Sequence, residues 1–397
     1  MQSIHRVWRS RRRSLRLEPL ESRRAPATLV SPFQVTYQDA DGDRVAVTLS
    51  KPLLTPDNVD GVLQFDVGRV DGDNTTRQQL RAIDVRALEF HIPGLSITVM
   101  ATRGPATGGD GRAPVGRINA GDQELGVVTI DGDLGQLDGG GDPANIPRLR
   151  GLAVHSLGRF GLATGAVQQV VTVRGPVAFI RVATDVTGVA IHVGNGNFGG
   201  PAGRVGSVFV GGSLIGGAAD DSGGLSTEGP LGPIIIRGDL IGGPGFWSGR
   251  IDTFARLAAI TVGGSVVGGP ALESGQIAAT AGMGPVVIRG DVVGGAGELS
   301  GTVFSYGSGS VSRVAVGGSV RGGTGRASGS VLVFTGVGVV HVGGNLVGGS
   351  AAASAGLTDA GMIEAGRITR LTIGGSLIAG TNGTADPFQC NGAIRVR

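Results

Sequence analysis

Three aspartates at alternate positions are the clearest candidates for chemistry in this chain. Asp39, Asp41 and Asp43 stand in the run D-A-D-G-D. Carboxylate oxygens are ligands that calcium prefers, so these three residues form the candidate metal site, and calcium is the one cofactor that the sequence leaves open. They do not form an EF-hand, because Arg44 occupies the position where that loop needs glycine and no glutamate closes it. A solvated hairpin turn is the alternative, which the sequence favours. The pairs Asp71 with Asp73 and Asp131 with Asp133 have the same two interpretations.

Acidic residues also occur in the second half of the chain, where a catalytic site could lie. Enzymes that cleave acidic polysaccharides on a β-helix cluster several carboxylates from successive coils beside Arg or Lys. Asp220 and Asp221 lie in an insertion between coils, and the neighbouring coils offer only Glu228, Asp252 and Glu273 as scattered candidates. We therefore expect no catalytic activity. Trp247, beside Phe246, could form a platform for a sugar ring, but a plug over the corner of a coil is the favoured interpretation.

The remaining reactive or recognisable residues have simpler explanations. Arg-Gly-Asp occurs at 237–239 and 289–291, but there it replaces Gly-Gly-Ser in a repeating corner, so coil geometry explains it better than cell adhesion does. The five histidines have no companion ligands at metal spacing, and Cys390 has no paired base in the sequence.

A repeat of about 26 residues sets the elements that must position these side chains. It reads VFVGGSLIGG at 208–217 and recurs six times, the last copy being LTIGGSLIAG at 371–380, with spacings of 26, 26, 26, 28, 26 and 31. A fixed period of this kind is typical of a solenoid, whose units bury their apolar faces by stacking.

Three apolar positions recur in every unit and would point inward. Apolar residues two apart on a strand share a face, as in the pair Ile260 and Val262. A second position follows the glycines, as at Val266, and a third lies in the G-x-[IVL] pieces, as at Ile277. Three ladders per unit indicate three short strands per coil, and parallel crossovers are right-handed in nearly all cases. The predicted fold is therefore all-β: a right-handed parallel β-helix preceded by a small β unit.

Two further recurring positions concern the corners and the outer face of the coils. The residue after each GG or RG is short and polar, alternating Ser and Asp from Ser213 to Ser319, and it could accept hydrogen bonds from turn N–H groups. Outward ladders through Ile235 and Ile241 are partly apolar. Either the corners and loops cover them, or they form a surface for lateral packing. Before residue 208, the anchors Ile130, Val154, Val173 and Val193 suggest shorter, imperfect coils with spacings of 24, 19 and 20.

The charge of the chain is concentrated at its start. Net charge is +3, but residues 1–24 hold eight arginines against Glu18 and Glu21, which is +6 and leaves about −3 for the rest. A nucleic-acid partner would normally require a basic stripe on the folded body, and the sequence predicts none. It also contains no apolar run long enough for a membrane-spanning helix. The one cysteine rules out a disulfide framework within the chain.

Residues 1–30 form a basic leader, and residues 31–105 a small β unit. The unit has a hairpin pattern at 33–49 and candidate strands at 61–67, 79–85 and 94–101. The β-helix is predicted over 106–397. It would be incomplete at its end, because residues 390–397 match the start of another coil.

The leader and the repeats together resemble a family. Arg13, Leu15, Leu17, Glu18 and Leu20, followed by Glu21 and Arg23, match the R-x-L-x-L-E-x-L-E-x-R leader of large bacterial surface proteins. The stretches 115–140 and 149–161 are similar to the opening coils of uncharacterised bacterial β-solenoid proteins.

The resemblance implies a secreted or cell-surface bacterial protein with a structural or adhesive role and no catalytic activity. The expected partners are a second copy of the chain or a cell-envelope or glycan component, not nucleic acid. A polysaccharide-processing β-helix enzyme, a lyase or glycoside hydrolase, is the alternative. A groove lined by carboxylates from adjacent coils, with an aromatic side chain nearby, would favour the enzyme.

Overall fold

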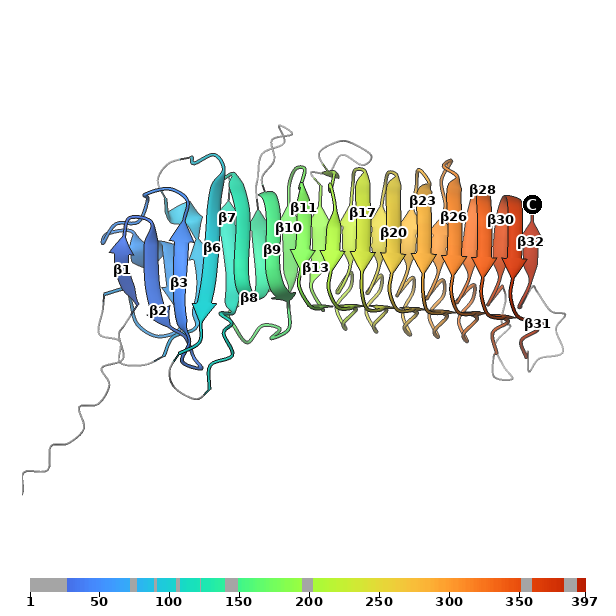
Figure 1. The fold of residues 1–397 in the computed structure, drawn as a ribbon, viewed down its shortest axis with the longest axis horizontal. Helices are drawn as coiled ribbons and strands as arrows, with labels where there is room; N and C mark the ends of the chain where they lie inside the picture. Colours follow the sequence, from blue (N-terminus) through green and yellow to red (C-terminus); the bar gives the residue numbers. More distant parts are fainter. Residues whose placement is uncertain are drawn as a thin grey trace, which may run out of the picture.

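The protein is a straight rod of stacked β-strands, as Figure 1 shows. The computed structural model describes residues 27–71, 77–88, 91–104, 108–121, 123–139, 149–194, 203–350, 359–381 and 391–397. The helical elements with described bounds are α1 (Val59–Val62) and the 3-10 turn η1 (Val85–Ala87). The predicted all-β parallel β-helix is confirmed.

Each coil contributes one strand to each of three sheets. In the first regular coil these strands are β14 (Val208–Val210), β15 (Leu214–Ile215) and β16 (Leu225–Thr227), and each pairs in parallel with its equivalent in the next coil. The first sheet continues through β17 (Leu231–Ile236), β20 (Leu257–Val262), β23 (Met283–Ile288), β26 (Val311–Val316), β28 (Val331–Val342) and β30 (Ile363–Ile373). The second sheet continues through β18 (Leu240–Ile241), β21 (Val266–Val267), β24 (Val292–Val293), β27 (Val320–Arg321), β29 (Leu346–Val347) and β31 (Leu377–Ile378). The third continues through β19 (Ile251–Thr253), β22 (Ile277–Ala279), β25 (Val303–Ser305), the first part of β28, the first part of β30 and β32 (Ile394–Val396).

The three predicted inward ladders are confirmed except at the last coil, where Leu377 is 54% and Ile394 39% exposed. Ile260 of the first sheet pairs with Ile234 and Val286 on the coils either side, and it is 1% exposed. The second ladder pairs Val266 with its neighbours, and the third pairs Ile277 with its own, through every regular coil to the last. Each of the three sheets therefore contributes at least one continuous column of Val, Ile and Leu to the interior of the rod.

The prediction of shorter coils before residue 208 holds for the spacings of 24 and 20, since Ile130 stacks on Val154 and Val173 on Val193, but it is wrong for the link between Val154 and Val173. Ile130 pairs with Val154 in the first sheet, but Val154 then pairs with Val182, and Val182 with Val210, each 28 residues on. Val173 and Val193 pair with each other in the third sheet. The proposed anchor series joined two sheets, because irregular connections between the early strands hide the period. The strands concerned are β7 (Val115–Gly121), β8 (Leu125–Gly139), β9 (Leu149–Leu157), β10 (Val170–Val173), β11 (Phe179–Val182), β12 (Val186–Thr187) and β13 (Ala190–Val193).

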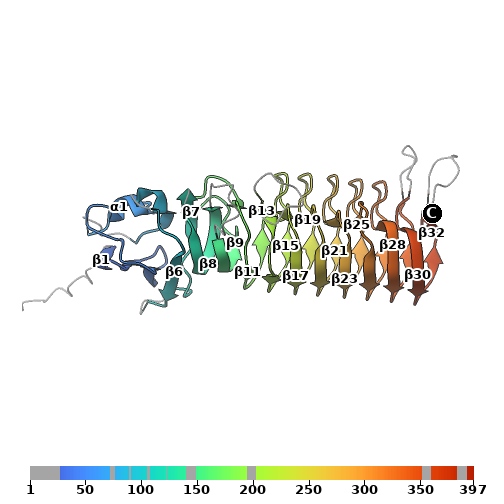
Figure 2. The same cartoon turned by 90° about the horizontal axis from the view of Figure 1, so that it is seen from above.

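The small N-terminal β unit caps the solenoid and shares its sheet. The predicted hairpin is formed by β2 (Gln34–Gln38) and β3 (Arg44–Leu49), flanked by β1 (Thr28–Ser31) and β6 (Leu95–Thr102), all antiparallel. β6 then pairs in parallel with β8. A second antiparallel pair, β4 (Leu63–Phe65) and β5 (Leu80–Asp84), joins β7 in the same way. Figures 1 and 2 show this unit closing one end of the rod.

Polar side chains stitch the corner between the first and second sheets. The Asp239 N–H donates to the Ser213 hydroxyl at 3.0 Å, and the Ser265 N–H donates to the Asp239 carboxylate at 2.6 Å. The same alternation runs from Asp185 to Ser376. In the predicted polar ladder, one backbone N–H per coil thus donates to a side chain of the preceding coil.

A buried serine ladder was not foreseen. In five successive coils a serine accepts from a glycine N–H and donates to a carbonyl within the loop that leads to the third sheet. Ser274, for example, accepts from Gly269 and donates to Ala271, both at 2.9 Å, and is fully buried. The other members are Ser222, Ser248, Ser300 and Ser328. The spacing of five from the second glycine to S-G was the available signal.

The two outward ladders do point outward. Ile235 lies between buried neighbours and is 46% exposed. Ile241 is half-buried next to the buried Leu240, so the corner does not turn both members inward. The following loop covers part of this position: a side chain at Gly249 would lie 2.0 Å from the Ile241 carbonyl oxygen.

We expect Ile260→Asp to abolish the stable fold. The change places an unpaired charge in a dry column, and such burial belongs to the class that costs more than about 4 kcal/mol. Thr261→Asp, the outward neighbour, is the matched control and should cost less than about 1 kcal/mol. Urea denaturation followed by circular dichroism measures both. Equal, small losses for the two variants would contradict the assigned register.

Candidate metal centre and carboxylate cleft

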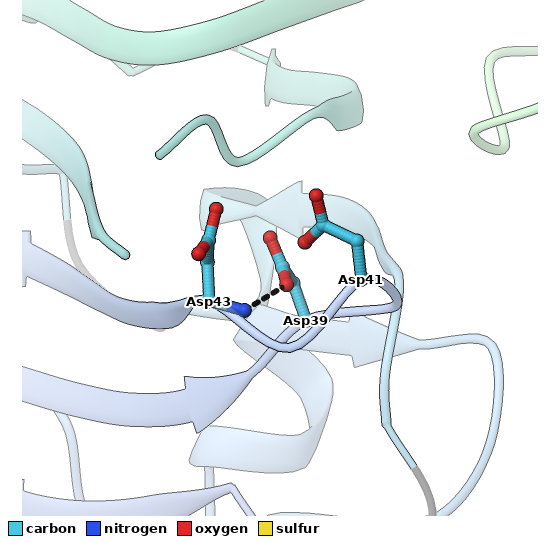
Figure 3. Close-up of side chains that lie close together, drawn as sticks. All are labelled: Asp39, Asp41 and Asp43. Atoms are coloured by element: carbon cyan, nitrogen blue, oxygen red, sulfur yellow. Dashed lines mark hydrogen bonds between the residues drawn. The ribbon is translucent and has the colours of Figure 1, made fainter. Parts of the chain in front are cut away.

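The acidic turn is a tight hairpin corner at the cap. Asp39 follows β2 and Asp43 precedes β3, and Figure 3 shows the three carboxylates side by side. One Asp39 oxygen accepts from the Gly42 N–H at 3.0 Å and from the Asp43 N–H at 2.7 Å. Gly42 has a φ of 106°, a conformation that favours glycine. The turn is therefore fixed by its own backbone.

The segment that follows β6 closes over this turn. The Asp43 carboxylate accepts from the Gly104 N–H at 3.0 Å and from the Gly111 N–H, and Asp43 is fully buried. Asp41 accepts from the Asp110 N–H at 3.2 Å. The prediction of a solvated turn is therefore wrong for Asp39 and Asp43, which are both buried. Backbone more than sixty residues further along the chain bonds to Asp43 and to Asp41.

Two carboxylate oxygens in this cluster have no hydrogen-bond partner. They are Oδ2 of Asp39, which is 3% exposed, and Oδ1 of Asp41. One oxygen from each of the three aspartates lies within 4.8 Å of the others. Gln78, which forms a β-bridge with Asp39, is also buried with its Oε1 unpartnered. Buried acceptors without donors are costly, so this cluster calls for a proton or a cation.

The pKa values of Asp39 and Asp41 are shifted by their burial and by their closeness to each other. Burial raises the pKa of Asp39 to about 8, and the hydrogen bond shared with Asp41 adds to the rise. Burial opposes charge on Asp41 too, but the hydrogen bonds from Asp39 and from the Asp110 N–H lower the pKa of Asp41 overall. At neutral pH the two carboxylates therefore share one proton when no cation is bound.

The donor set fits a hard cation. All available ligand atoms are oxygens, as calcium and magnesium require. Within the described ranges no other trio of His, Cys, Asp or Glu lies close enough to hold a metal. The acids of the other predicted pairs already have protein partners. Asp133 accepts hydrogen bonds from the Ser156 hydroxyl and from the Arg159 N–H, and Asp131 forms a salt bridge with Arg112. Asp71 accepts a hydrogen bond from the Leu29 N–H in β1. Asp73 and Cys390 lie outside the described residues.

A second cluster lies on the third sheet, where the sequence suggested only scattered acids. Asp221, Trp247, Arg250, Asp252 and His192 line a small cleft. Arg250 bonds Asp252 at 3.1 Å and Glu273 at 2.9 Å. Carboxylates from three successive coils thus surround one arginine.

The electrostatics of the cleft single out Asp252. Burial raises the pKa of Asp252, Arg250 lowers it, and the nearby Glu273 and Asp221 raise it further. Trp247 is 39% exposed at the rim, in a left-handed conformation with a φ of 57°. Asp221 and Glu273 occupy the equivalent position of the coils on either side, which is why residues 26 apart meet here. Glu228 does not line this cleft.

The Asp residues of both Arg-Gly-Asp tripeptides belong to the corner ladder. Asp291 accepts from the Ser319 N–H at 2.6 Å, as Asp239 does from Ser265. The interpretation as part of the coil is confirmed.

Comparison with family models, with curated proteins and with solved structures found no match to this chain. Among the described residues, no helix is long and apolar enough to cross a membrane. The residues themselves therefore carry the functional argument.

The raised pKa of Asp39 predicts an unusual pH dependence without a cation. The folded state holds a proton on Asp39 that the unfolded state releases, because in the unfolded chain the pKa of this carboxyl returns to its ordinary value of 3.8. Stability should therefore fall as pH rises from about 5 to about 7, by up to about 1.4 kcal/mol per unit. Asp39→Asn should flatten this slope. Urea unfolding in the presence of a chelator measures it, and equal slopes for wild type and variant would exclude the shared proton.

Proposed function

We propose that this protein is a rigid β-solenoid displayed outside a bacterial cell, where it serves as a structural or adhesive element without catalytic activity. The observation that carries this proposal is the register. From β14 to the last coil, each inward position pairs with the same position on the next coil. Such a lattice resists bending and presents outward residues at a fixed interval of about 4.8 Å. The leader-like residues 13–23 support export.

A calcium ion at Asp39, Asp41 and Asp43 would lock the cap of the rod. The ion would replace the shared proton and satisfy the two orphan oxygens. All three carboxylates belong to the β2–β3 turn, and those of Asp41 and Asp43 also accept hydrogen bonds from the segment after β6. An ion that fixes these carboxylates would therefore stabilise the contact between the turn and that segment. Calcium is abundant outside cells, so the lock would suit an exported protein.

We expect calcium to raise the melting temperature of the purified protein. Binding only to the folded state stabilises it by about 2.7 kcal/mol at a hundredfold excess over Kd, which corresponds to several degrees in a chain of this size. Asp39→Asn should abolish the shift, whereas Asp57→Asn, at an exposed residue of the same unit, should preserve it. Differential scanning calorimetry with calcium, with magnesium and with a chelator measures the effect. A shift of the same size in Asp39→Asn would remove the site from this turn.

The carboxylate cleft favours a second candidate, a polysaccharide-processing enzyme. It contains the features that would distinguish an enzyme: acids from adjacent coils and an aromatic side chain at the rim. Asp252, with its raised pKa, could donate a proton to a leaving oxygen, and Asp221 could act on the opposite side. Arg250 argues against this role, because it already neutralises both Asp252 and Glu273.

One pair of assays separates the two functions. The purified chain is incubated with a panel of acidic and neutral polysaccharides to follow depolymerisation, and its binding to whole bacterial cells is measured in parallel. We expect cell binding without depolymerisation, and no effect of Asp252→Asn on binding. Depolymerisation that Asp252→Asn reduces by more than a hundredfold, with Asp220→Asn as the control, would instead establish the enzyme. Failure to bind cells, without depolymerisation, would contradict both.

A further inference from the structure

The outer side of the first sheet is a basic face. Nine arginines stand on it between β9 and β30, and all are exposed: Arg150, Arg181, Arg204, Arg237, Arg256, Arg289, Arg313, Arg367 and Arg370. The first-sheet segments 149–157, 177–183, 204–210, 230–237, 256–263, 282–289, 310–317, 336–343 and 366–374 contain no Asp or Glu. The expectation that the folded body carries no basic stripe is therefore wrong.

These arginines are not consumed by ion pairs. None of the nine takes part in a salt bridge among the described residues. Surface arginines in folded proteins are usually interspersed with acids. The acids of the solenoid lie instead at its corners and on the third sheet, for example Asp239 and Asp252. The first-sheet face is thus basic, and the nearest acids lie at the corner that borders it.

The register distributes the nine arginines over an area. Arg204, Arg256 and Arg367 share a column at the start of the strands. Arg237 and Arg289 share another, seven residues along the strand and so roughly 23 Å away. Arg313 and Arg370 lie between them. Along the axis the set extends over eight coil steps, or about 38 Å.

The shape of this array indicates a planar partner. A linear polymer lying along the rod would meet one column, which offers at most three arginines, and a duplex would curve away from the edge columns. A single-stranded nucleic acid needs aromatic platforms, but the ring of Phe209 is covered by Arg181 at 5.1 Å and Arg237 at 5.4 Å. Figure 1 shows the first-sheet strands side by side along the rod without a marked bend.

The side chains also suit a phosphate-rich surface. Arginine presents a planar fork that matches phosphate oxygens, and the chain uses arginine almost throughout, Lys51 being its sole lysine. Between the arginines stand small or apolar residues, including the 46% exposed Ile235. Exposed apolar side chains within a basic field are typical of proteins that lie on a membrane.

We propose that the first sheet of this solenoid docks flat on a bilayer surface rich in acidic phosphate headgroups. Each basic residue near such a surface contributes a similar increment to binding, so the nine arginines act together. The rod then lies along the membrane, with the third sheet and its cleft turned away from it.

Vesicle flotation tests the proposal on the full chain. The probes are vesicles of equal parts phosphatidylglycerol and phosphatidylcholine, and vesicles of phosphatidylcholine alone. The face variant combines R237Q, R256Q and R289Q, from three successive coils. The control combines R159Q, R321Q and R326Q, three exposed arginines off this face. Residues 1–24 are common to all three proteins, so any difference between variants reports the folded body.

Wild type and control should float with the acidic vesicles and not with phosphatidylcholine. The face variant should bind on the order of a hundredfold more weakly, and raising the salt concentration should release the wild type. Circular dichroism confirms that each variant folds. The proposal fails if wild type does not float, or if face and control variants lose binding equally. Binding of each protein to heparin and to duplex DNA is measured separately. The proposal also fails if the face variant loses binding to these polyanions but keeps its binding to the acidic vesicles, because the partner is then a soluble polymer.

Discussion

The parallel stacking of one coil on the next is the constraint on which the rest of this molecule depends. Backbone hydrogen bonds fix the distance between coils at about 4.8 Å, and every side chain must accept that spacing. Inside the rod the spacing suits Val, Ile and Leu, which form unbroken columns on all three sheets. At the corners it leaves almost no room: a side chain at Gly223 would lie 1.9 Å from the Ile215 carbonyl oxygen. The glycine content of the chain follows from this crowding.

The same constraint explains why polar groups in the rod form ladders. A buried N–H in a corner must find an acceptor within one coil step, and short side chains such as Ser274 and Asp239 reach it. Side chains on the outside of the rod also stack at one coil step, but they have no buried backbone group whose hydrogen bond they must complete. The types of these outward residues depend only on what the rod contacts, so the absence of acids from the first-sheet strands is informative about function.

The sequence was sufficient to predict the interior but not the outside. Ile260 and its equivalents recur at a nearly constant spacing, and such a spacing can be read from the sequence alone. Trp247, Asp221 and Glu273 also occupy one column, but the residue type at this position differs from coil to coil. No repeated residue type in the sequence therefore indicates the cleft. The arginines of the first sheet stand in several columns, and only the register reveals that they share a face. The acidic turn was recognised from its pattern, whereas its burial depends on Gly104 and Gly111, which no local pattern connects to it.

The corner ladder has a consequence for how this rod could have lengthened. Its acceptors alternate: Asp239, Ser265, Asp291, Ser319. Removing or duplicating one coil would bring two aspartates, or two serines, onto adjacent steps, and adjacent aspartates would repel. Removing or duplicating two coils preserves the alternation. Arg237 and Arg289, which precede the two aspartates, recur with the same double step. By the chemistry of its corner, this solenoid therefore repeats every two coils, although its visible repeat is a single one.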